Sequence, residues 1–291
     1  MKTSHIGAIG LIVVSLVPRM WATGPDRTRP ADVRFASSQP GEVVIPVLIG
    51  GEGPYRFLLD TGSSHSVISQ TLATTLSAVP VAKAPIATSV GSILAPVVRL
   101  SDVAVGSAHV ESLLATLLPS AADEILDDRI VGVLGQDFLS RFNYTLDYRT
   151  SRLSWDDEDL IEKGVHLALE PSRGRFLVRL PQDKLCRCAV RLVPDSGANG
   201  VVLFAGTEAD RLDVSTAVTS MRTSTLVGAG TARGVIVRVL LVGSAALWDL
   251  PAARVVLPEG TTEDGDGLLP LSMFARVSFR HREGYMMVQP R

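Results

Sequence analysis

The sequence Leu58-Leu59-Asp60-Thr61-Gly62-Ser63 runs from an apolar stretch directly into an acid and a glycine. A second copy, Leu192-Val193-Pro194-Asp195-Ser196-Gly197-Ala198, repeats this order in the second half of the chain. Such a pattern predicts a strand that ends in a sharp turn at the acid, because glycine lets the backbone approach the carboxylate closely. The hydroxyl groups of Thr61 and Ser196 are expected to hydrogen-bond within these turns.

Each copy is followed, at the same distance, by an apolar string that begins with glycine. The strings are Gly132-Val133-Leu134-Gly135 and Gly267-Leu268-Leu269-Pro270, and the spacing from Asp60 to Gly132 equals that from Asp195 to Gly267. A repeat of acid, glycine turn and apolar string at constant spacing indicates an internal duplication. If the two halves pack about a pseudo-twofold axis, the two acids meet across that axis.

The composition favours an all-β chain. Hydrophobic residues make up 46% of the sequence and aromatic residues only 5%, with many valines, leucines and glycines, which suits short strands packed face to face. Glycine-containing turns at Val90-Gly91 and Val227-Gly228 separate alternating apolar runs and are expected to be hairpin tips. We therefore expect two similar β-barrel-like lobes, at residues 41–155 and 173–291, with few short helices.

The net charge and the spacing of the histidines argue against nucleic-acid binding and metal binding. The formal net charge is −2 without a long basic run, so no nucleic-acid partner is expected. The five histidines show no metal-ligand spacing, and no metal or other cofactor is expected. The acidic run at residues 156–159 is interpreted as part of a solvated linker between the lobes, at residues 156–172.

The N-terminus has the pattern of a targeting segment. Lys2 precedes an apolar run from Ile6 to Val17, which is short for a membrane span and typical of a signal peptide. Residues 1–22 are predicted to be a signal peptide and residues 23–40 a flexible lead-in or a removable pro-segment. This predicts a secreted or periplasmic protein, with an uncleaved membrane tether or a buried N-terminal strand as alternatives.

The chain contains two cysteines, Cys186 and Cys188. Residues two apart on one strand point their side chains in parallel, so a disulfide between them would be strained. The sequence therefore predicts two reduced thiols on a strand that leads to the second Asp motif.

Two adjacent carboxyl groups suit a specific hydrolytic chemistry. They cannot both ionise cheaply, so one keeps a proton while the other is charged. The charged member can take a proton from a water molecule, and the protonated member can hydrogen-bond the carbonyl group under attack. Such a pair hydrolyses an amide bond without a metal, a cofactor or a covalent intermediate.

These motifs resemble those of aspartic peptidases of the pepsin/retropepsin superfamily. The resemblance rests on Asp60-Thr61-Gly62-Ser63-Ser64, Asp195-Ser196-Gly197-Ala198 and the two downstream apolar strings, and it covers residues 41 to 291. It implies an aspartic endopeptidase with a cleft between two lobes and an Asp60/Asp195 dyad. It also implies an extended peptide or protein substrate, and flaps tipped by Val90, Gly91, Val227 and Gly228.

The sequence departs from that family in several places. No tyrosine lies between Tyr55 and Tyr144, where pepsin-like enzymes carry a flap tyrosine, so the chain is more similar to a fused retropepsin-type dimer and is expected to be a monomer. Pro270 stands where the first half has Gly135, so the packing there is expected to differ. Ser63 can hydrogen-bond the neighbouring carboxylate and Ala198 cannot, which predicts that Asp60 is the more acidic partner.

Two other interpretations remain open at this point. A non-catalytic peptide-binding module could use the same fold, although such copies commonly lose an acid and this chain retains both. An unrelated β-rich envelope protein could carry the motifs by chance, in which case Asp60 and Asp195 would lie far apart.

Overall fold

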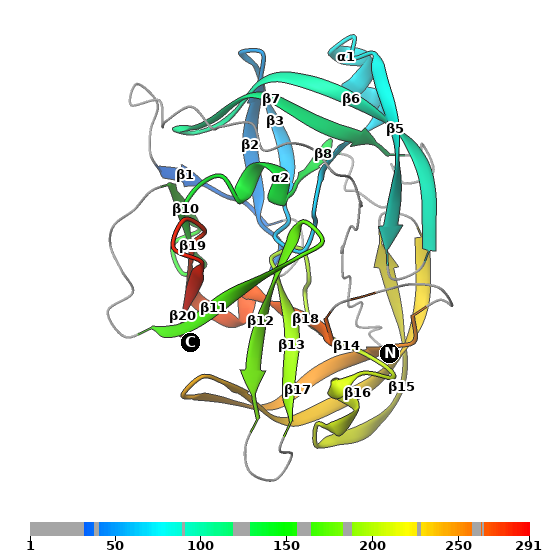
Figure 1. The fold of residues 1–291 in the computed structure, drawn as a ribbon, viewed down its shortest axis with the longest axis vertical. Helices are drawn as coiled ribbons and strands as arrows, with labels where there is room; N and C mark the ends of the chain where they lie inside the picture. Colours follow the sequence, from blue (N-terminus) through cyan, green and yellow to red (C-terminus); the bar gives the residue numbers. More distant parts are fainter. Residues whose placement is uncertain are drawn as a thin grey trace.

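The computed structural model describes residues 32–37, 41–88, 91–118, 129–155, 164–182, 188–225, 228–257, 263 and 265–291. The predicted signal peptide and most of the predicted lead-in lie outside these residues, as do Val90, Val227 and Cys186. Two lobes lie at the top and bottom of Figure 1, joined at the left by a shared sheet. Among the described residues, no helix is long and apolar enough to cross a membrane.

The N-terminal lobe is built on a seven-stranded sheet in the order β2-β3-β8-β4-β7-β6-β5. β2 also pairs with β6, so six of these strands close into a barrel. A short helix, α1 (Gln70–Thr75), follows β4 and begins where the Ser69 hydroxyl accepts a hydrogen bond from the Leu72 N–H. The strand bounds are β2 Val44–Ile49, β3 Glu52–Leu59, β4 Ser66–Ile68, β5 Pro80–Thr88, β6 Gly91–Val105, β7 Ala108–Leu117 and β8 Gly132–Leu134.

The C-terminal lobe repeats this strand order as β12-β13-β18-β14-β17-β16-β15. In both lobes the strand that leads to the acid pairs in parallel with the glycine-led string. Phe57 of β3 is level with Gly132, and Leu192 of β13 is level with Gly267. The bounds are β12 Arg175–Pro181, β13 Ala189–Asp195, β14 Val201–Phe204, β15 Val214–Thr225, β16 Gly228–Val242, β17 Ala245–Val255 and β18 Gly267–Pro270. The predicted all-β fold is confirmed.

The helices that follow the glycine-led strings differ between the lobes. α2 (Gln136–Leu139) follows Gly135, whereas a 3₁₀ turn, η3 (Leu271–Met273), follows Pro270. A Cβ atom at Gly135 would lie 2.7 Å from the backbone of His65, so only glycine fits there.

A six-stranded sheet joins the two lobes. Its order is β1-β10-β9-β19-β20-β11, with β9 and β19 antiparallel at the centre. Tyr144 of β9 is level with Phe279 of β19, its counterpart in the second half, so the pseudo-twofold axis passes between them. Their rings stack with centroids 4.9 Å apart. The bounds are β1 Asp32–Arg34, β9 Tyr144–Asp147, β10 Arg152–Trp155, β11 Val165–Ser172, β19 Phe274–Arg280 and β20 Tyr285–Pro290.

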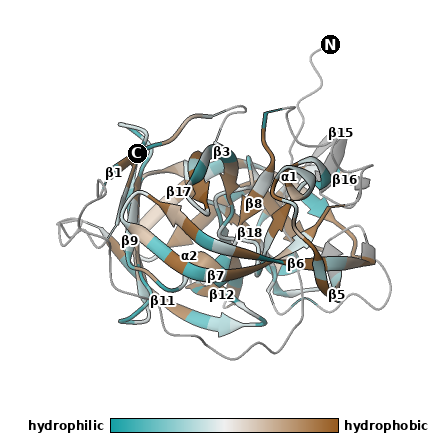
Figure 2. Ribbon diagram, turned by 90° about the horizontal axis from the view of Figure 1, so that it is seen from above, coloured by the Kyte–Doolittle hydropathy of each residue, from teal (hydrophilic) through white to brown (hydrophobic). Residues whose placement is uncertain are grey.

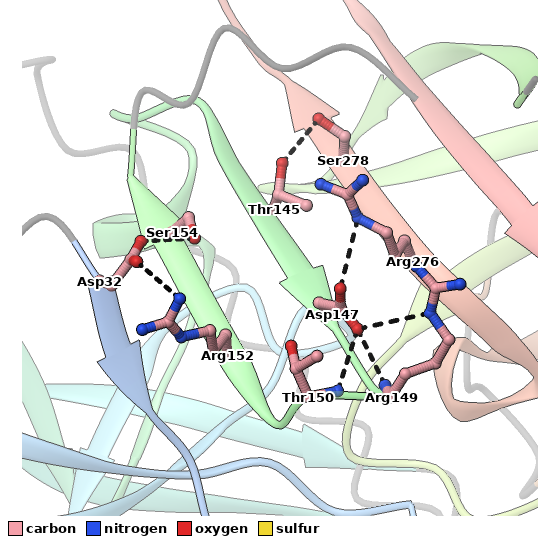
Figure 3. A network of polar contacts seen from close by, with 9 residues as sticks. All are labelled: Asp32, Thr145, Asp147, Arg149, Thr150, Arg152, Ser154, Arg276 and Ser278. Atoms are coloured by element: carbon pink, nitrogen blue, oxygen red, sulfur yellow. Dashed lines mark hydrogen bonds and ion pairs between the residues drawn. The ribbon is translucent and has the colours of Figure 1, made fainter. Parts of the chain in front are cut away.

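The face of this sheet that points away from the aromatic core carries polar pairs (Figure 3). Asp147 of β9 faces Arg276 of β19, with 3.5 Å between Oδ2 and Nε, and the Thr145 hydroxyl donates to Ser278 Oγ over 3.1 Å. The Asp147–Arg276 ion pair is partly exposed, and ion pairs near the surface contribute little stability. The apolar strands therefore supply most of the stabilisation, and hydrophobic residues run along β6, β7 and β17 in Figure 2.

Two segments expected to be irregular contain strands. β1 lies inside the predicted lead-in and pairs with β10, and its residue Val33 is buried. β11 occupies the C-terminal part of the predicted linker at 156–172 and pairs with β20 and β12. Val165, Leu167 and Leu169 alternate with more exposed residues and pack into the core, a period-two pattern that the acidic run before it obscured.

The prediction of two reduced thiols is wrong, because Cys188 is disulfide-bonded. The premise that both cysteines lie on a strand fails at Cys188, which precedes β13. Its carbonyl oxygen accepts a hydrogen bond of 2.9 Å from the Gln182 N–H and so closes the connection between β12 and β13. Side chains in such a connection need not run parallel, as they do along one strand.

Removing the ring of Phe279 should destabilise the whole chain, because that ring is fully buried at the axis of the joining sheet. Phe279→Ala is expected to lower the free energy of unfolding by about 3–5 kcal/mol in urea titration. Trp248→Ala is the matched control, since that aromatic side chain is exposed and its loss should change stability by less than about 0.5 kcal/mol. Equal effects of the two substitutions would contradict the assignment of Phe279 to the core.

Candidate active site

The two Asp turns lie at the ends of matching strands. Asp60 follows β3 and donates its N–H to the carbonyl oxygen of Leu134 over 3.0 Å, while Asp195 ends β13 level with Pro270. Both side chains are fully buried, with no exposed surface. The structure therefore brings the two predicted acids to the same level between the lobes, each held by its own parallel strand pair.

Reciprocal hydrogen bonds join the two turns across the axis. The Thr61 hydroxyl donates to the carbonyl of Pro194 over 2.7 Å and accepts from the Ser196 N–H over 3.0 Å. The Ser196 hydroxyl donates to the carbonyl of Leu59 over 2.7 Å and accepts from the Thr61 N–H over 3.0 Å. All four bonds are buried, so the position of one turn fixes the position of the other. We call this set the hydroxyl grip.

Each carboxyl group is oriented by its own turn in the same way. Asp60 Oδ1 accepts the N–H groups of Gly62 and Ser63 over 2.8 and 3.1 Å. Asp195 Oδ1 accepts those of Gly197 and Ala198 over 2.7 and 3.0 Å. Apart from the opposing carboxyl group, neither Oδ2 atom has a hydrogen-bond partner among the described residues. The two Oδ2 atoms are therefore the ones left for chemistry.

Both turns need glycine because each turn packs closely against the acid of the other half. A Cβ atom at Gly62 would lie 2.6 Å from Cγ of Asp195, and one at Gly197 would lie 3.0 Å from Cγ of Asp60. Each glycine therefore packs directly against the acid of the other half. This contact excludes the interpretation in which the two acids lie far apart and the motifs occur by chance.

Burial raises the pKa values of both acids. Burial raises the pKa of Asp60 well above its usual range, and the charge of Asp195 and a hydrogen bond shared with it raise it further. Burial raises the pKa of Asp195 to about 6, while the N–H groups of its turn, the hydrogen bond to Asp60 and the charge of Arg175 oppose that rise. The two buried acids therefore do not both ionise readily.

The structure removes the premise of the prediction that Asp60 is the more acidic partner. That prediction required the Ser63 hydroxyl to stabilise the Asp60 carboxylate. The hydroxyl instead donates to the carbonyl of His65 over 2.7 Å. Ser63 reaches Asp60 through its backbone N–H, as Ala198 reaches Asp195, so this pair of positions supplies no asymmetry.

Two supporting residues were missed by sequence reasoning. Gln136, the first residue of α2, donates from Nε2 to the carbonyl of Thr61 over 2.9 Å and so supports the Asp60 turn. Arg175, the first residue of β12, is buried and its charge reaches Asp195. Gln136 directly follows the glycine-led string and could have been suspected. Arg175 carries no motif that marks it.

The predicted flap hairpins exist, but their function stays a prediction. β5 and β6 pair up to Thr88 and Gly91, and β15 and β16 pair up to Thr225 and Gly228. Both hairpins extend to the same side of the molecule, at the right of Figures 1 and 2. Val90 and Val227 lie in the two connections that are outside the described residues.

Residues 45–141 match the family model described as gag-polyprotein putative aspartyl protease. This segment begins in β2 and ends two residues after α2, and it contains the Asp60 turn and the first glycine-led string. The match ends before Asp195, so the family comparison covers only the first half of the chain. The second half repeats the strand order of the first and carries the second Asp turn.

A crystal structure of a retropepsin-like aspartic protease from Rickettsia conorii is also similar to the chain. The identity is 19%, the TM-score is 0.32, and the similarity covers 43% of this chain and 89% of that one. A search of curated proteins found no match.

The hydroxyl grip should contribute strongly to stability. Thr61→Val keeps the shape of the side chain but leaves the buried Pro194 carbonyl and Ser196 N–H without their partner. We expect a loss of about 2–4 kcal/mol in the free energy of unfolding, measured in urea. Thr61→Ser keeps the hydroxyl and should retain most of the stability. A Thr61→Val protein as stable as wild type would contradict the importance of these bonds.

The dyad should cost stability at neutral pH. A carboxyl group whose pKa rises on folding favours the folded state below its unfolded pKa, and that advantage is lost as pH rises through its folded pKa. For Asp195 this window extends from about 4 to about 6. Asp195→Asn should therefore be more stable than wild type by on the order of 3 kcal/mol above this window and by much less below it.

The control for this comparison is Asp213→Asn, because Asp213 is exposed and should show no such pH-dependent difference. The measurement is thermal or urea unfolding at several pH values. A constant difference between Asp195→Asn and wild type across the window would refute a raised pKa at Asp195.

Proposed function

We propose that the chain is an aspartic endopeptidase in which Asp60 and Asp195 together activate a water molecule. The observation that carries this proposal is the pair of fully buried carboxyl groups that face each other across the axis, each oriented through Oδ1 by two backbone N–H groups. The match of residues 45–141 to an aspartyl protease family supports the same reaction class.

The pKa order assigns a role to each acid. Asp195, whose pKa is the less raised of the two, ionises first and acts as the general base that takes a proton from water. Asp60 starts protonated, hydrogen-bonds the oxygen of the substrate carbonyl and passes its proton to that oxygen as water attacks. The water oxygen then bonds to the carbonyl carbon, and a tetrahedral diol forms without a covalent bond to the protein.

Collapse of this diol completes the reaction. The proton that Asp195 took from water passes to the leaving nitrogen, and the bond between carbon and nitrogen breaks to give an acid and an amine. Asp60 recovers the proton that it passed to the diol, so the dyad ends the cycle as it began. The buried N–H groups at each Oδ1 keep the carboxyl groups in place throughout, which limits reorganisation during the reaction.

The substrate is proposed to be a peptide or protein bound in an extended conformation. Extended peptides bind by backbone pairing to strand edges, and the β5–β6 and β15–β16 hairpins are the candidates to cover them. Because both acids belong to one chain, the proposed enzyme is a monomer that contains its own pseudo-dimer. A non-catalytic peptide-binding module would bind the same ligand without turnover.

We also propose that the protein is exported to the periplasm or secreted. The apolar run from Ile6 to Val17 has the length of a signal peptide core. The disulfide at Cys188 supports the same compartment, since disulfides persist mainly in oxidising environments outside the cytosol. A fusion of residues 1–40 to a reporter that matures only in an oxidising compartment tests the export directly.

Cleavage of a denatured protein substrate tests the proposed activity. Wild type should cleave it, with kcat/KM rising toward higher pH along an acidic limb near the Asp195 pKa of about 6. Asp60→Asn should lower kcat/KM by at least about 100-fold, whereas the exposed control Asp213→Asn should retain it. Equal cleavage by wild type and Asp60→Asn would end this proposal, and tight peptide binding without turnover would favour the binding module.

A further inference from the structure

Two glycines occupy matching places at the entrances of the lobes, and a different charge follows each of them. Gly41 precedes Glu42 in the first half, and Gly174 precedes Arg175 in the second. Both glycines have positive φ angles, +95° and +79°. The two segments therefore share a conformation but carry opposite charges.

Both glycines lie against the Asp turn of the opposite lobe. A Cβ atom at Gly41 would lie 3.8 Å from the Cα atom of Asn199, four residues after Asp195. A Cβ atom at Gly174 would lie 3.2 Å from the Cβ atom of Ser64, four residues after Asp60. Of the two charged residues that follow these glycines, Arg175 has a charge that reaches the dyad, at Asp195.

Strand register places Arg175 level with Asp195. Val178 of β12 is paired with Leu192 of β13, and both strands continue for three more residues, to Arg175 and to Asp195. Because the pairing is antiparallel, counting three residues back along β12 and three residues forward along β13 brings Arg175 level with Asp195.

The first lobe carries the opposite charge at the corresponding position. Val44 of β2 is paired with Leu58 of β3, and the Leu59 N–H donates to the carbonyl of Val43 over 2.8 Å. One further residue back along the chain is Glu42, which precedes β2. The position that corresponds to Arg175 is therefore occupied by an acid in the first half.

Arg175 is held firmly in this place. It is only 3% exposed, and its Nη2 atom lies 2.6 Å from Oε2 of Glu263, which is 4% exposed. A guanidinium group keeps its charge even when buried, and its weak hydration makes it the cation best suited to such a site. The Glu263 carboxylate neutralises part of that charge, so the effect on the dyad depends on both members of the pair.

The charged groups around Asp195 come from several elements. Asp60 faces it from the turn after β3, and Arg175 from β12, with Glu263 behind Arg175. Tyr148, which follows β9, also lies close enough for the charge of Asp195 to raise the pKa of its hydroxyl. Among these neighbours, Arg175 is the one whose charge favours the ionised form of Asp195.

We propose that Arg175 is a positioning residue that polarises the dyad, making Asp195 the carboxylate that receives the proton of water and leaving the shared proton on Asp60. This proposal rests on the proposed peptidase function. Arg175 does not touch the reacting atoms; its buried positive charge, matched by Glu42 in the other half, decides which of two similarly built acids is the base. The repeated turns alone would leave the two acids interchangeable.

The test is the pH profile of kcat/KM on a denatured protein substrate. Arg175→Gln should move the acidic limb to higher pH by about one unit, because loss of the cation makes Asp195 harder to ionise. Glu263→Gln should move the limb to lower pH, because the charge of Arg175 is then no longer opposed. Arg175→Lys keeps the charge and should leave the limb near its wild-type position.

If Arg175 and Glu263 form an ion pair that only stabilises the fold, the pH profiles of their variants will differ from this expectation. In that case Arg175→Gln and Glu263→Gln both lower the unfolding temperature and kcat, with no movement of the limb or with movement in the same direction, and the proposal is overturned. If Arg175→Gln fails to fold, the downward shift in Glu263→Gln decides the question by itself.

A carboxyl titration by ¹³C NMR separates this proposal from the proposed function. In wild type, the Asp195 signal should titrate at lower pH than the Asp60 signal, with assignments taken from Asp60→Asn and Asp195→Asn. This order can be observed even in a protein that cleaves nothing, in which case the peptidase proposal fails and the polarised dyad stands. The reverse order in wild type overturns the role of Arg175.

Discussion

The hydroxyl grip between Thr61 and Ser196 is the constraint on which the site depends. It uses two side chains and four backbone groups, and each hydroxyl both donates to and accepts from the opposite half of the chain. Because these groups are buried, separation of the lobes would leave every one of them without a partner and away from water. The distance between the two acids is thus set by bonds that lie directly beneath them.

The joining sheet supplies the second constraint, on orientation. Tyr144 and Phe279 stack at the centre of the β9–β19 pair, where the pseudo-twofold axis passes. A shift of that pairing by one residue would turn both rings away from the core, because successive side chains of a strand point to opposite faces. The register therefore fixes the axis, and the axis determines that the two Asp turns meet.

The sequence was sufficient to predict the elements that are repeated. The Asp turns, the glycine-led strings and the all-β lobes each leave a local pattern in the sequence. Because the chain is duplicated, each of these patterns occurs twice. The strands β1 and β11 were harder to predict, because each gains its stability from pairing with strands that are distant in the sequence. Arg175 was missed for a related reason, since only the strand register brings it level with Asp195.

The prediction that the Ser63 hydroxyl bonds the Asp60 carboxylate failed because it depended on the orientation of a single side chain. A serine beside a carboxylate has several acceptors within reach, and the choice depends on local backbone geometry that composition does not reveal. Here the carbonyl of His65 takes the hydroxyl proton. The asymmetry of the dyad therefore arises from a charged residue that lies far from Asp60 in the sequence, in the other half of the chain.

Unequal halves also matter for the direction of a bound chain. An extended peptide runs from an amino end to a carboxyl end, and a cleft with two identical halves presents the same surroundings when the peptide is reversed. With Glu42 on one side of the axis and Arg175 on the other, reversal exchanges an acidic neighbourhood for a basic one. If the chain binds an extended peptide as proposed, its two halves offer different surroundings to the two directions of that peptide, which a symmetric pair of half-sites does not.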